Sequence, residues 1–277
     1  MRLASEFTLM THETLIIARE GAVLRITMNR PQARNALSPV MVGELTEALL
    51  EARDDSEIRA VMLMGAGGTF CAGGDLKAME GRNAAGGSGP EATAASNRRF
   101  GALLELADAL PKAVIVLIEG SAMGGGVGLV AIADWAIAER NAQIGTPEVT
   151  VGLVPAQIAP FLAARIGYTQ ARRMASFGLR LRAEEALRVG LVHELADGRD
   201  DLLAKGVAAT NQVLRCAPEA VAVTKQLVRA SLREPLGPTL DAASHLFATA
   251  LAREAREGIR GFIEKRKPAW AKKIEKL

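Results

Sequence analysis

The chain has 277 residues, of which 49% are hydrophobic, and its 34 basic and 31 acidic side chains leave a net charge of +3. This length and composition are typical of a globular protein with one large domain, or with a domain and an appendage. Aromatic residues make up only 4% of the chain, which is too few for a surface that stacks on bases. Because much of the basic excess lies in the tail 265–273, we expect no nucleic-acid partner.

Metal-ligating side chains are few and scattered. The cysteines and histidines, none at ligand spacing, are Cys71, Cys216, His12, His193 and His245. This pattern predicts no metal site. Residues 1–11 contain no sustained apolar stretch, so the sequence predicts neither a signal peptide nor a membrane span, and the expected location is cytoplasmic.

Strands and helices alternate in the first half of the chain. An apolar run predicts a strand at 23–28, and Ser38 followed by Pro39 predicts the start of a helix that continues to residue 53. A second strand is expected at 60–64. The segment 81–97 is rich in Gly, Ala and Ser and contains Pro90, which predicts a mobile loop.

The pattern changes toward the C-terminus. After a helix at 98–110, the continuous apolar run 113–118 is typical of a strand covered on both faces. A short buried helix at 127–133 and a strand at 134–138 follow. Beyond Pro155 the predicted elements are helices, which begin at 169 and continue at 183–189, 200–215, 218–233 and 239–265. An α/β core with a helical C-terminal region is therefore expected.

Two glycine-rich turns are the strongest functional signal. The first, at 69–77, and the second, at 119–128, each follow an apolar run and lead into a predicted helix, where backbone N–H groups have no partner. Two such turns can direct two N–H donors at one carbonyl oxygen and so form an oxyanion hole. Glu148, shortly after the second turn, would transfer the proton. The combination points to chemistry on an activated acyl group.

Each of these features also has a simpler interpretation. The second turn has no register that matches a dinucleotide fingerprint or a P-loop, so its glycines can serve tight packing alone. Glu148 can cap a helix or lie in solvent. Cys71 is interpreted as a small packing residue, Ser121 lies outside a nucleophile elbow, and His193 is interpreted as structural.

Six segments, taken together, resemble the crotonase (enoyl-CoA hydratase/isomerase) superfamily. In order they read NRP at 29–31 with RNAL at 34–37, FCAGGDLK at 70–77, EG at 119–120 with GGG at 124–126, PE at 147–148 with GLVP at 152–155, ALRVGLV at 186–192, and FIEKRKP at 262–268. They extend over nearly the whole chain. The resemblance implies a ClpP/crotonase-like spiral of β-β-α units over residues 1–200 and a helical trimerisation region over 201–277. It also implies a trimer or a dimer of trimers.

The resemblance also implies roles for individual residues. The thioester carbonyl of an acyl-CoA would lie between the N–H groups of Gly74 and Gly125, with Glu148 as the catalytic acid. Coenzyme A is then part of the substrate, and no separate cofactor is expected. Contacts to it are expected from Arg34, Ala36, Ala72, Asp75, Leu76, Lys77, Gly124, Pro147, Phe262 and Lys265. Arg30, Arg34 or Lys265 would meet its phosphates, and Phe262 and Lys265 would reach the CoA of a neighbouring subunit.

One departure from the family pattern limits the choice of reaction. The two-glutamate hydratases carry their other acid where this chain has Gly128. Hydration is the expected reaction, with a carboxylate of the substrate or an ordered water filling the space at Gly128. A double-bond isomerase, which needs one acid, and a non-catalytic CoA-binding protein remain alternatives.

The local sequence narrows the resemblance further. GGGVGL at 124–129 and LVPAQIAP at 153–160 resemble the bacterial branch that hydrates 3-branched glutaconyl-CoA esters in leucine or acyclic terpene breakdown. Within this branch, isohexenylglutaconyl-CoA hydratase shows the nearest resemblance and 3-methylglutaconyl-CoA hydratase the next.

Overall fold

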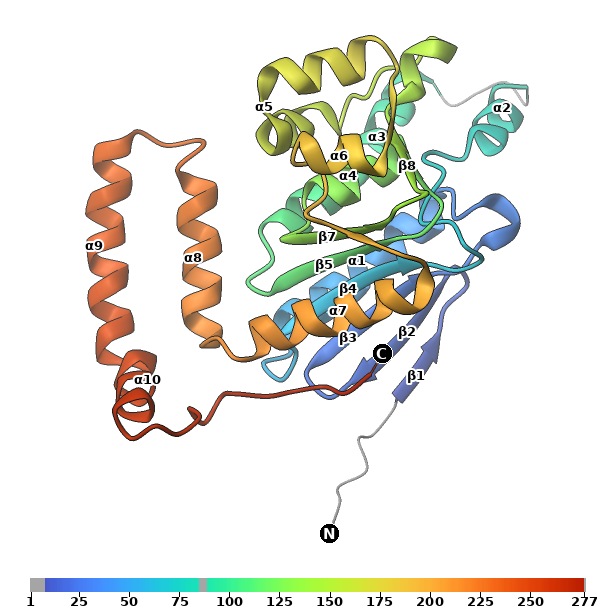
Figure 1. The fold of residues 1–277 in the computed structure, drawn as a ribbon. Helices are drawn as coiled ribbons and strands as arrows, with labels where there is room; N and C mark the ends of the chain where they lie inside the picture. Colours follow the sequence, from blue (N-terminus) through green and yellow to red (C-terminus); the bar gives the residue numbers. More distant parts are fainter. Residues whose placement is uncertain (1–7, 85–88, 277) are drawn as a thin grey trace.

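The computed structural model describes residues 8–84 and 89–276, and its centre is a mostly parallel sheet (Figure 1). Within these ranges the sheet has seven strands in the order β1-β2-β3-β4-β5-β7-β10. Their bounds are Thr8–Thr11, Leu15–Glu20, Val23–Met28, Ala60–Gly65, Ala113–Ile118, Trp135–Glu139 and Glu194–Ala196. The pairs β1–β2 and β2–β3 are antiparallel, and all the others are parallel.

A second, smaller sheet lies next to the main one (Figure 1). It consists of β6 (Ser121–Met123), β8 (Gln143–Gly145) and β9 (Arg180–Arg182), with β6 parallel to β8 and β8 antiparallel to β9. These strands have three residues each, too few to show a period in the sequence. The sheet joins the second glycine turn to the segment that precedes Glu148.

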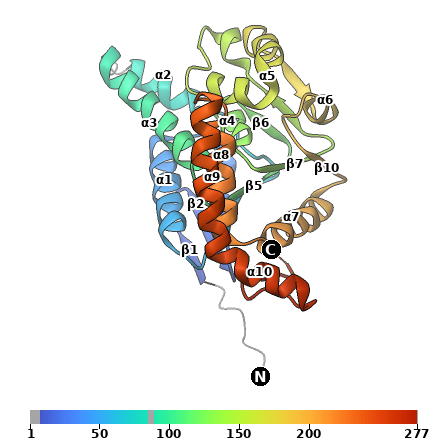
Figure 2. The ribbon, with the colours of Figure 1, turned by 90° about the vertical axis from the view of Figure 1, so that its left-hand side faces the viewer.

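Helices cover both faces of the main sheet. In Figure 2, α1 (Pro39–Asp54) and α3 (Pro90–Asp108) lie on one side of the strands and α7 (Arg199–Leu214) on the other. Side chains alternate accordingly along β4: Val61 and Leu63 join the core under α1 and α3, and Met62 and Met64 join the core under α7. The predicted double-sided burial of 113–118 is confirmed.

The helix predicted after Ser38 is also confirmed. The Ser38 hydroxyl accepts a hydrogen bond from the Met41 N–H at 3.2 Å and so caps α1. The apolar residues of α1 then recur every three or four positions and are buried against the sheet. The short helix after the second turn, α4 (Gly125–Ala131), is buried as well, as its sequence predicts.

The predicted boundaries are wrong in two segments in the middle of the chain, at 81–97 and at the helix expected from 169. The segment 81–97 is not a loop: α2 (Leu76–Ala84) runs into it and α3 begins at Pro90, while 85–88 lie outside the described residues. Proline at the first helical position, followed by alanines, favours this helix. The next helix, α5 (Ala159–Ser176), begins ten residues earlier than predicted and is interrupted at Gly167.

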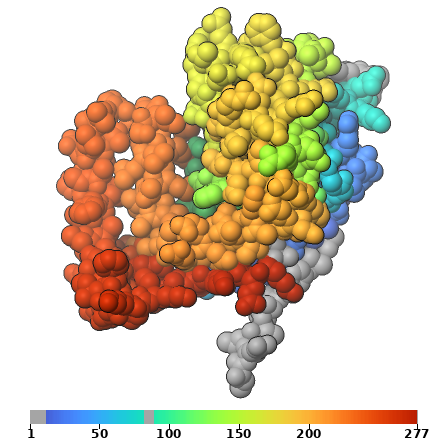
Figure 3. Space-filling model, in the orientation of Figure 1, coloured from blue at the N-terminus to red at the C-terminus, as the bar shows by residue number. Residues whose placement is uncertain are grey.

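The C-terminal helices form an arm that projects from the body (Figure 3). It consists of α8 (Pro218–Ala230), α9 (Leu236–Ala252) and α10 (Glu254–Ile263), so the single helix expected at 239–265 is broken at Arg253. Of the residues in α9 only Thr239 is buried. The predicted division at residue 200 stays a prediction, although α7, which begins next to it, packs on the sheet.

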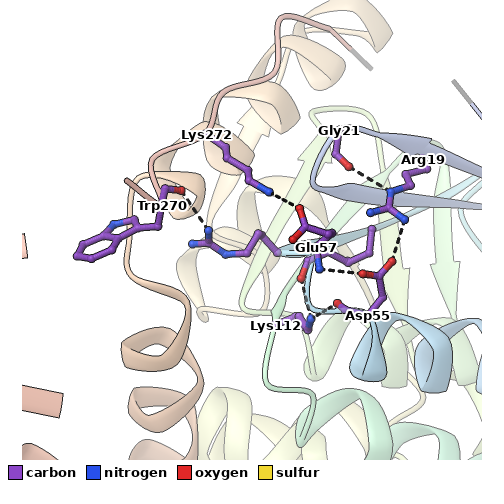
Figure 4. Close-up of polar contacts among 9 residues, drawn as sticks. Arg19, Gly21, Asp55, Glu57, Lys112, Trp270 and Lys272 are labelled. Atoms are coloured by element: carbon purple, nitrogen blue, oxygen red, sulfur yellow. Dashed lines mark hydrogen bonds and ion pairs between the residues drawn. The ribbon is translucent and has the colours of Figure 1, made fainter. Parts of the chain in front are cut away.

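The segment after the arm returns to the sheet and is fastened there by polar contacts (Figure 4). Lys272 Nζ pairs with Glu57 Oε2 at 2.9 Å, and Arg59 donates to the Trp270 carbonyl at 3.2 Å. Asn211 exchanges two hydrogen bonds of 2.9 Å with the backbone of Ile274, whose side chain is buried. Across the described residues we find no helix long and apolar enough to cross a membrane.

Candidate active site

The two glycine turns lie against each other. Cys71 pairs with Ala122 in a parallel bridge, in which the Cys71 N–H donates to Ser121 O at 3.0 Å and the Met123 N–H to Cys71 O at 2.8 Å. Gly73, at φ +92°, is so close to the second turn that a Cβ there would lie 2.9 Å from Met123 O. Only glycine permits this approach, which brings segments fifty positions apart in the sequence into contact.

The N–H groups of Gly74 and Gly125 are available for a ligand. Leu37 N–H donates to Gly73 O at 2.8 Å and Asp75 N–H to Leu37 O at 3.3 Å, so the alternating N–H of Gly74 points away from that contact. Gly125 is the first residue of α4, where a helix leaves its N–H unpaired. Neither N–H has a hydrogen-bond acceptor among the described residues.

Glu148 lies beside the second turn, in the 3₁₀ helix η2 (Pro147–Val151). A Cβ added to Gly124, at φ +51°, would lie 3.0 Å from Glu148 Oε1. The other oxygen, Oε2, is buried and has no hydrogen-bond partner among the described residues. Burial raises the pKa of this carboxyl, and the bond from its own backbone N–H opposes the rise. A carboxylate placed in this way can hold a water molecule or exchange a proton with a ligand.

The space at Gly128 is filled by apolar side chains. A Cβ at this buried position would lie 3.0 Å from Leu104 Cδ1 and 3.3 Å from Phe100 Cζ, both on α3. Next to the Cβ position this space offers a charge or a water no polar partner, which counts against the expectation of a substrate carboxylate or an ordered water there. Glu148 is the carboxylate that the structure brings to the two turns.

A glutamate at Gly128 is expected to unfold the site rather than restore a second acid. The added side chain would have to displace Leu104 and Phe100, and overpacking alone lowers the free energy of unfolding by about 1–3 kcal/mol. Urea denaturation of Gly128→Glu measures the loss. Gly43→Glu is the control, because nothing lies within 4 Å of that helical glycine. A variant as stable as the original chain, with faster hydration, would contradict the expectation.

Most of the predicted CoA-contact residues lie on two adjacent segments. Ala72 N–H donates to Arg34 O at 2.9 Å, which aligns 34–37 with 72–75. Leu76 and Lys77, at the start of α2, are exposed next to them, and Arg34, at φ 50°, is exposed as well. Gly124 and Pro147 lie next to Glu148. Residues 34–37 thus lie alongside 72–77 of the first turn, and the two segments form one edge.

Arg30 differs from its predicted role. It pairs with Asp75 at 3.0 Å and donates to Ala36 O at 2.7 Å, with both charged side chains largely buried. Asp75 also accepts from the Ala78 N–H at 3.1 Å and caps α2. Arg30 therefore fixes the first turn, and its pairing leaves Arg34 as the exposed guanidinium of this edge.

Phe262 and Lys265 are not brought to the turns within one chain. Both are exposed at the end of α10, which lies at the opposite end of the molecule from α2 in Figure 1. Their predicted contact is with the CoA of a neighbouring subunit, and this placement leaves it a prediction.

Asn35 is a residue whose importance the sequence analysis missed. It is fully buried with φ 55°, and its amide donates to Ala66 O at 2.9 Å and Thr69 O at 2.7 Å while accepting from the Arg30 N–H at 2.9 Å. These bonds hold the loop before the first turn. The available signal was its place in the RNAL segment at 34–37, which the resemblance to the family already singled out.

The structure agrees with the non-catalytic interpretations of Cys71 and His193. Burial raises the pKa of the Cys71 thiol to about 12, which leaves no thiolate for a nucleophile. His193 accepts from the Ala136 N–H at 2.9 Å, and burial lowers its pKa to about 4. Among the described residues no cluster of His, Cys, Asp and Glu is arranged to hold a metal ion.

The fold and this geometry define a class of α/β protein that can polarise a carbonyl group and transfer a proton beside it. Residues 18–273 match the family described as enoyl-CoA hydratase/isomerase. The short-chain-enoyl-CoA hydratase of Clostridium acetobutylicum is 32% identical over 91% of this chain and 95% of its own. The carnitinyl-CoA dehydratase of Salmonella enteritidis is 34% identical over 93% and 98%. The chain belongs to the enoyl-CoA hydratase/isomerase family.

Solved structures agree with this assignment. AtuE of Pseudomonas aeruginosa superposes with a TM-score of 0.90 and 50% identity, over 94% of this chain and 100% of that one. An enoyl-CoA hydratase/isomerase from Marinobacter aquaeolei has a TM-score of 0.89 and 45% identity, over the same shares. The predicted crotonase fold is confirmed, and the chain is an enzyme of the enoyl-CoA hydratase family that acts on acyl-CoA thioesters.

Proposed function

We propose that this enzyme adds water across the 2,3 double bond of an acyl-CoA and that Glu148 carries the proton transfer. The observation that supports the proposal most directly is the position of its carboxylate, against Gly124 and with one oxygen buried and unpaired among the described residues. Gly74 and Gly125, with their available N–H groups, would bind the thioester oxygen. Donors fixed by the backbone stabilise an enolate without reorganising during the reaction.

The chemistry then needs one carboxylate. Glu148 accepts a proton from water as the oxygen attacks C3, the electrons of the double bond move onto the thioester oxygen, and the two N–H groups stabilise the resulting enolate. Glu148 returns the proton to C2, and the enolate collapses to the 3-hydroxyacyl-CoA. Because one group acts on one face, addition is syn.

The substrate class we propose is a 3-branched glutaconyl-CoA. Its support is the resemblance of 124–129 and 153–160 to the isohexenylglutaconyl-CoA and 3-methylglutaconyl-CoA hydratases. The apolar surface that Phe100 and Leu104 place beside Gly125 and Gly128 suits an alkyl branch. The distal carboxylate of such a substrate would have to bind elsewhere than at Gly128.

Double-bond isomerisation is the second candidate, favoured by the apolar packing at Gly128. One base suffices to move a proton between two carbons, and no second acid is needed. The two reactions share the oxyanion hole, so the geometry of Gly74 and Gly125 supports both.

The deciding experiment is an assay over enoyl-CoA and 3-alkylglutaconyl-CoA substrates in ¹⁸O-labelled water. Hydration gives a 3-hydroxyacyl-CoA that carries the label, detected by mass spectrometry, with the highest kcat/KM for a 3-branched glutaconyl-CoA. Product without label would assign the isomerase activity. Label incorporated equally well into unbranched substrates would retain hydration and reject the glutaconyl specificity.

We also infer that the arm formed by α8, α9 and α10 packs on other copies of this chain, in a trimer or a dimer of trimers. Several of its large apolar side chains are exposed: Leu236 is 72% exposed, Phe247 70% and Phe262 86%. Apolar patches of this kind mark association surfaces. Assembly would bring Phe262 and Lys265 toward a neighbour's CoA.

A further inference from the structure

The two flanks of the segment that carries Glu148 are held differently. On the preceding side, Thr146 is buried, its N–H donates to Leu179 O and its hydroxyl to Met174 O, both at 3.1 Å. On the following side, residues 149–154 are exposed, and their hydrogen bonds are local, such as the one of 3.0 Å from the Leu153 N–H back to Glu148 O. Val149 and Thr150 also pack against Gly178, where an added Cβ would lie 3.2 Å and 2.8 Å from their methyl groups. The rest of this flank, 151–154, therefore depends most on what fastens the residues after it.

Gln157 makes that fastening by inserting into α3. Its Nε2 donates to Asn97 Oδ1 at 2.8 Å. Its amide lies directly over Gly101, a buried glycine in the same helix, where an added Cβ would be 2.0 Å from Oε1 and 2.9 Å from Cδ. The missing side chain at Gly101 thus leaves a notch in α3 that the Gln157 amide occupies.

The same stripe of α3 also covers the second glycine turn. Asn97, Gly101 and Leu104 are spaced four and three residues apart and share one side of the helix with Phe100. Phe100 Cζ lies 3.3 Å from the Cβ positions of both Gly125 and Gly128. Through α3, Gln157 therefore links the carboxylate side of the site to the oxyanion side.

We propose that Gln157 is a positioning residue that, seated in the Gly101 notch and held by Asn97, sets the distance between Glu148 and the oxyanion turns. The proposal rests on the proposed role of Glu148. Productive geometry must hold within about 0.5 Å, and the exposed residues 151–154 make only local backbone hydrogen bonds. Without Gln157 the segment moves away from α3 and takes Glu148 with it.

Gln157→Ala and Gly101→Ala are the paired test, since the first removes the amide from the notch and the second fills the notch with a methyl group that displaces the amide. Each is expected to lower kcat about tenfold, within the range for small displacements of catalytic groups, while KM changes less than twofold. The double variant is expected to be no slower than either single one, because both changes remove the same contact. Gly43→Ala, in open space on another helix, is the control for glycine replacement and is expected to leave kcat unchanged.

Two substitutions of the exposed residue Asn97 keep the test independent of folding. Asn97→Asp retains an acceptor for Gln157 Nε2 and is expected to keep near-full kcat, and Asn97→Leu is expected to lose several-fold. The acidic limb of the kcat–pH profile is expected to move to lower pH in Gln157→Ala, because solvent reaches the displaced Glu148 carboxylate. If Gln157 only stabilised the fold, the acidic limb of the kcat–pH profile would not move.

Three results would overturn the proposal. They are full kcat in Gln157→Ala, losses that multiply in the double variant, and an unmoved pH limb. If Glu148→Gln is inactive in the same assays while Gln157→Ala is fully active, only this inference fails. If Glu148→Gln is itself active, the proposed function fails first.

Discussion

Glu148→Gln is expected to lower kcat for hydration about a thousandfold, which is the usual contribution of a positioned acid–base group. The amide keeps the size of the side chain and can still hold a water molecule, but it cannot accept the proton. Binding of CoA should be unchanged, because the exchange of one oxygen for an amide nitrogen leaves the backbone of the predicted CoA contacts at 34–37, 72–77, Gly124 and Pro147 in place. Steady-state kinetics and calorimetric titration with CoA measure the two effects separately.

The same variant is expected to be more stable than the original chain at neutral pH. Burial raises the folded-state pKa of Glu148, so ionisation costs more in the folded than in the unfolded chain. This carboxyl contributes most to stability below its unfolded pKa, and the contribution is lost as the pH rises through the raised folded pKa. A neutral Gln removes that loss, which a higher melting temperature at pH 7 would register.

Two further measurements test the assignment of Glu148. The acidic limb of the original enzyme's kcat/KM–pH profile is expected above the ordinary glutamate range, since the base must be ionised to act. Glu47→Gln, on the exposed face of α1, is the control and should change neither kinetics nor melting. Full turnover by Glu148→Gln would remove Glu148 from the reaction.

Gly124→Ala is expected to lower kcat/KM about a hundredfold, the scale of loss when a catalytic group is moved by about 1 Å. Gly124 has φ +51° and ψ −118°, and an added Cβ would lie 3.0 Å from Glu148 Oε1 and 3.6 Å from Gly73 Cα. The methyl group would push the carboxylate and the first turn apart. Backbone strain of about 1–3 kcal/mol would add a loss of stability.

Gly190→Ala distinguishes the effect of backbone strain from that of the contact between residue 124 and Glu148. Gly190 also has a positive φ, of +80°, but nothing lies within 4 Å of its Cβ position. This variant should lose stability and keep its activity, as shown by thermal melting and kcat/KM together. Equal losses of activity in both variants would mean that the contact between Gly124 and Glu148 does not limit the reaction.

The sequence predicts the elements whose residues decide their own structure. The runs 60–64 and 113–118 are apolar throughout because both faces of β4 and β5 are buried. Ser38 and Pro39 set the start of α1 by local capping. The prediction of a loop at 81–97 was wrong because the segment mixes residues of opposite preference: its glycines and serine favour loops, but its alanines favour a helix. In addition, the residue after Gly89 is a proline, which can begin a helix.

In the candidate site, too, the features set by local sequence could be predicted and those set by tertiary contacts could not. The two glycine turns are visible in the sequence because only glycine fits their backbone, as at Gly73 and Gly124. Composition alone leaves Glu148 open to a capping role, since its contact with Gly124 is tertiary. The absence of an acid at Gly128 can be read from the sequence, but the side chains that fill its place come from α3, and no local pattern reports them. Arg30 was one of three residues expected to meet the phosphates, and its pairing with Asp75 could not be seen in a local pattern either, because Asp75 lies 45 positions away.

The return of the C-terminal segment to the sheet affects how the protein folds. Lys272 and Glu57 are 215 positions apart, and Ile274 completes a core that includes Val23 and Met62. Closing so long a loop costs entropy before any contact offsets it, so such contacts form late and slow the folding rate. The backbone N–H of Ile274, which donates to Asn211 Oδ1, and that of Lys272, which donates to Leu214 O, are then expected to exchange faster than the amides of the central strands. The arm's orientation therefore depends on contacts that are expected to form late in folding.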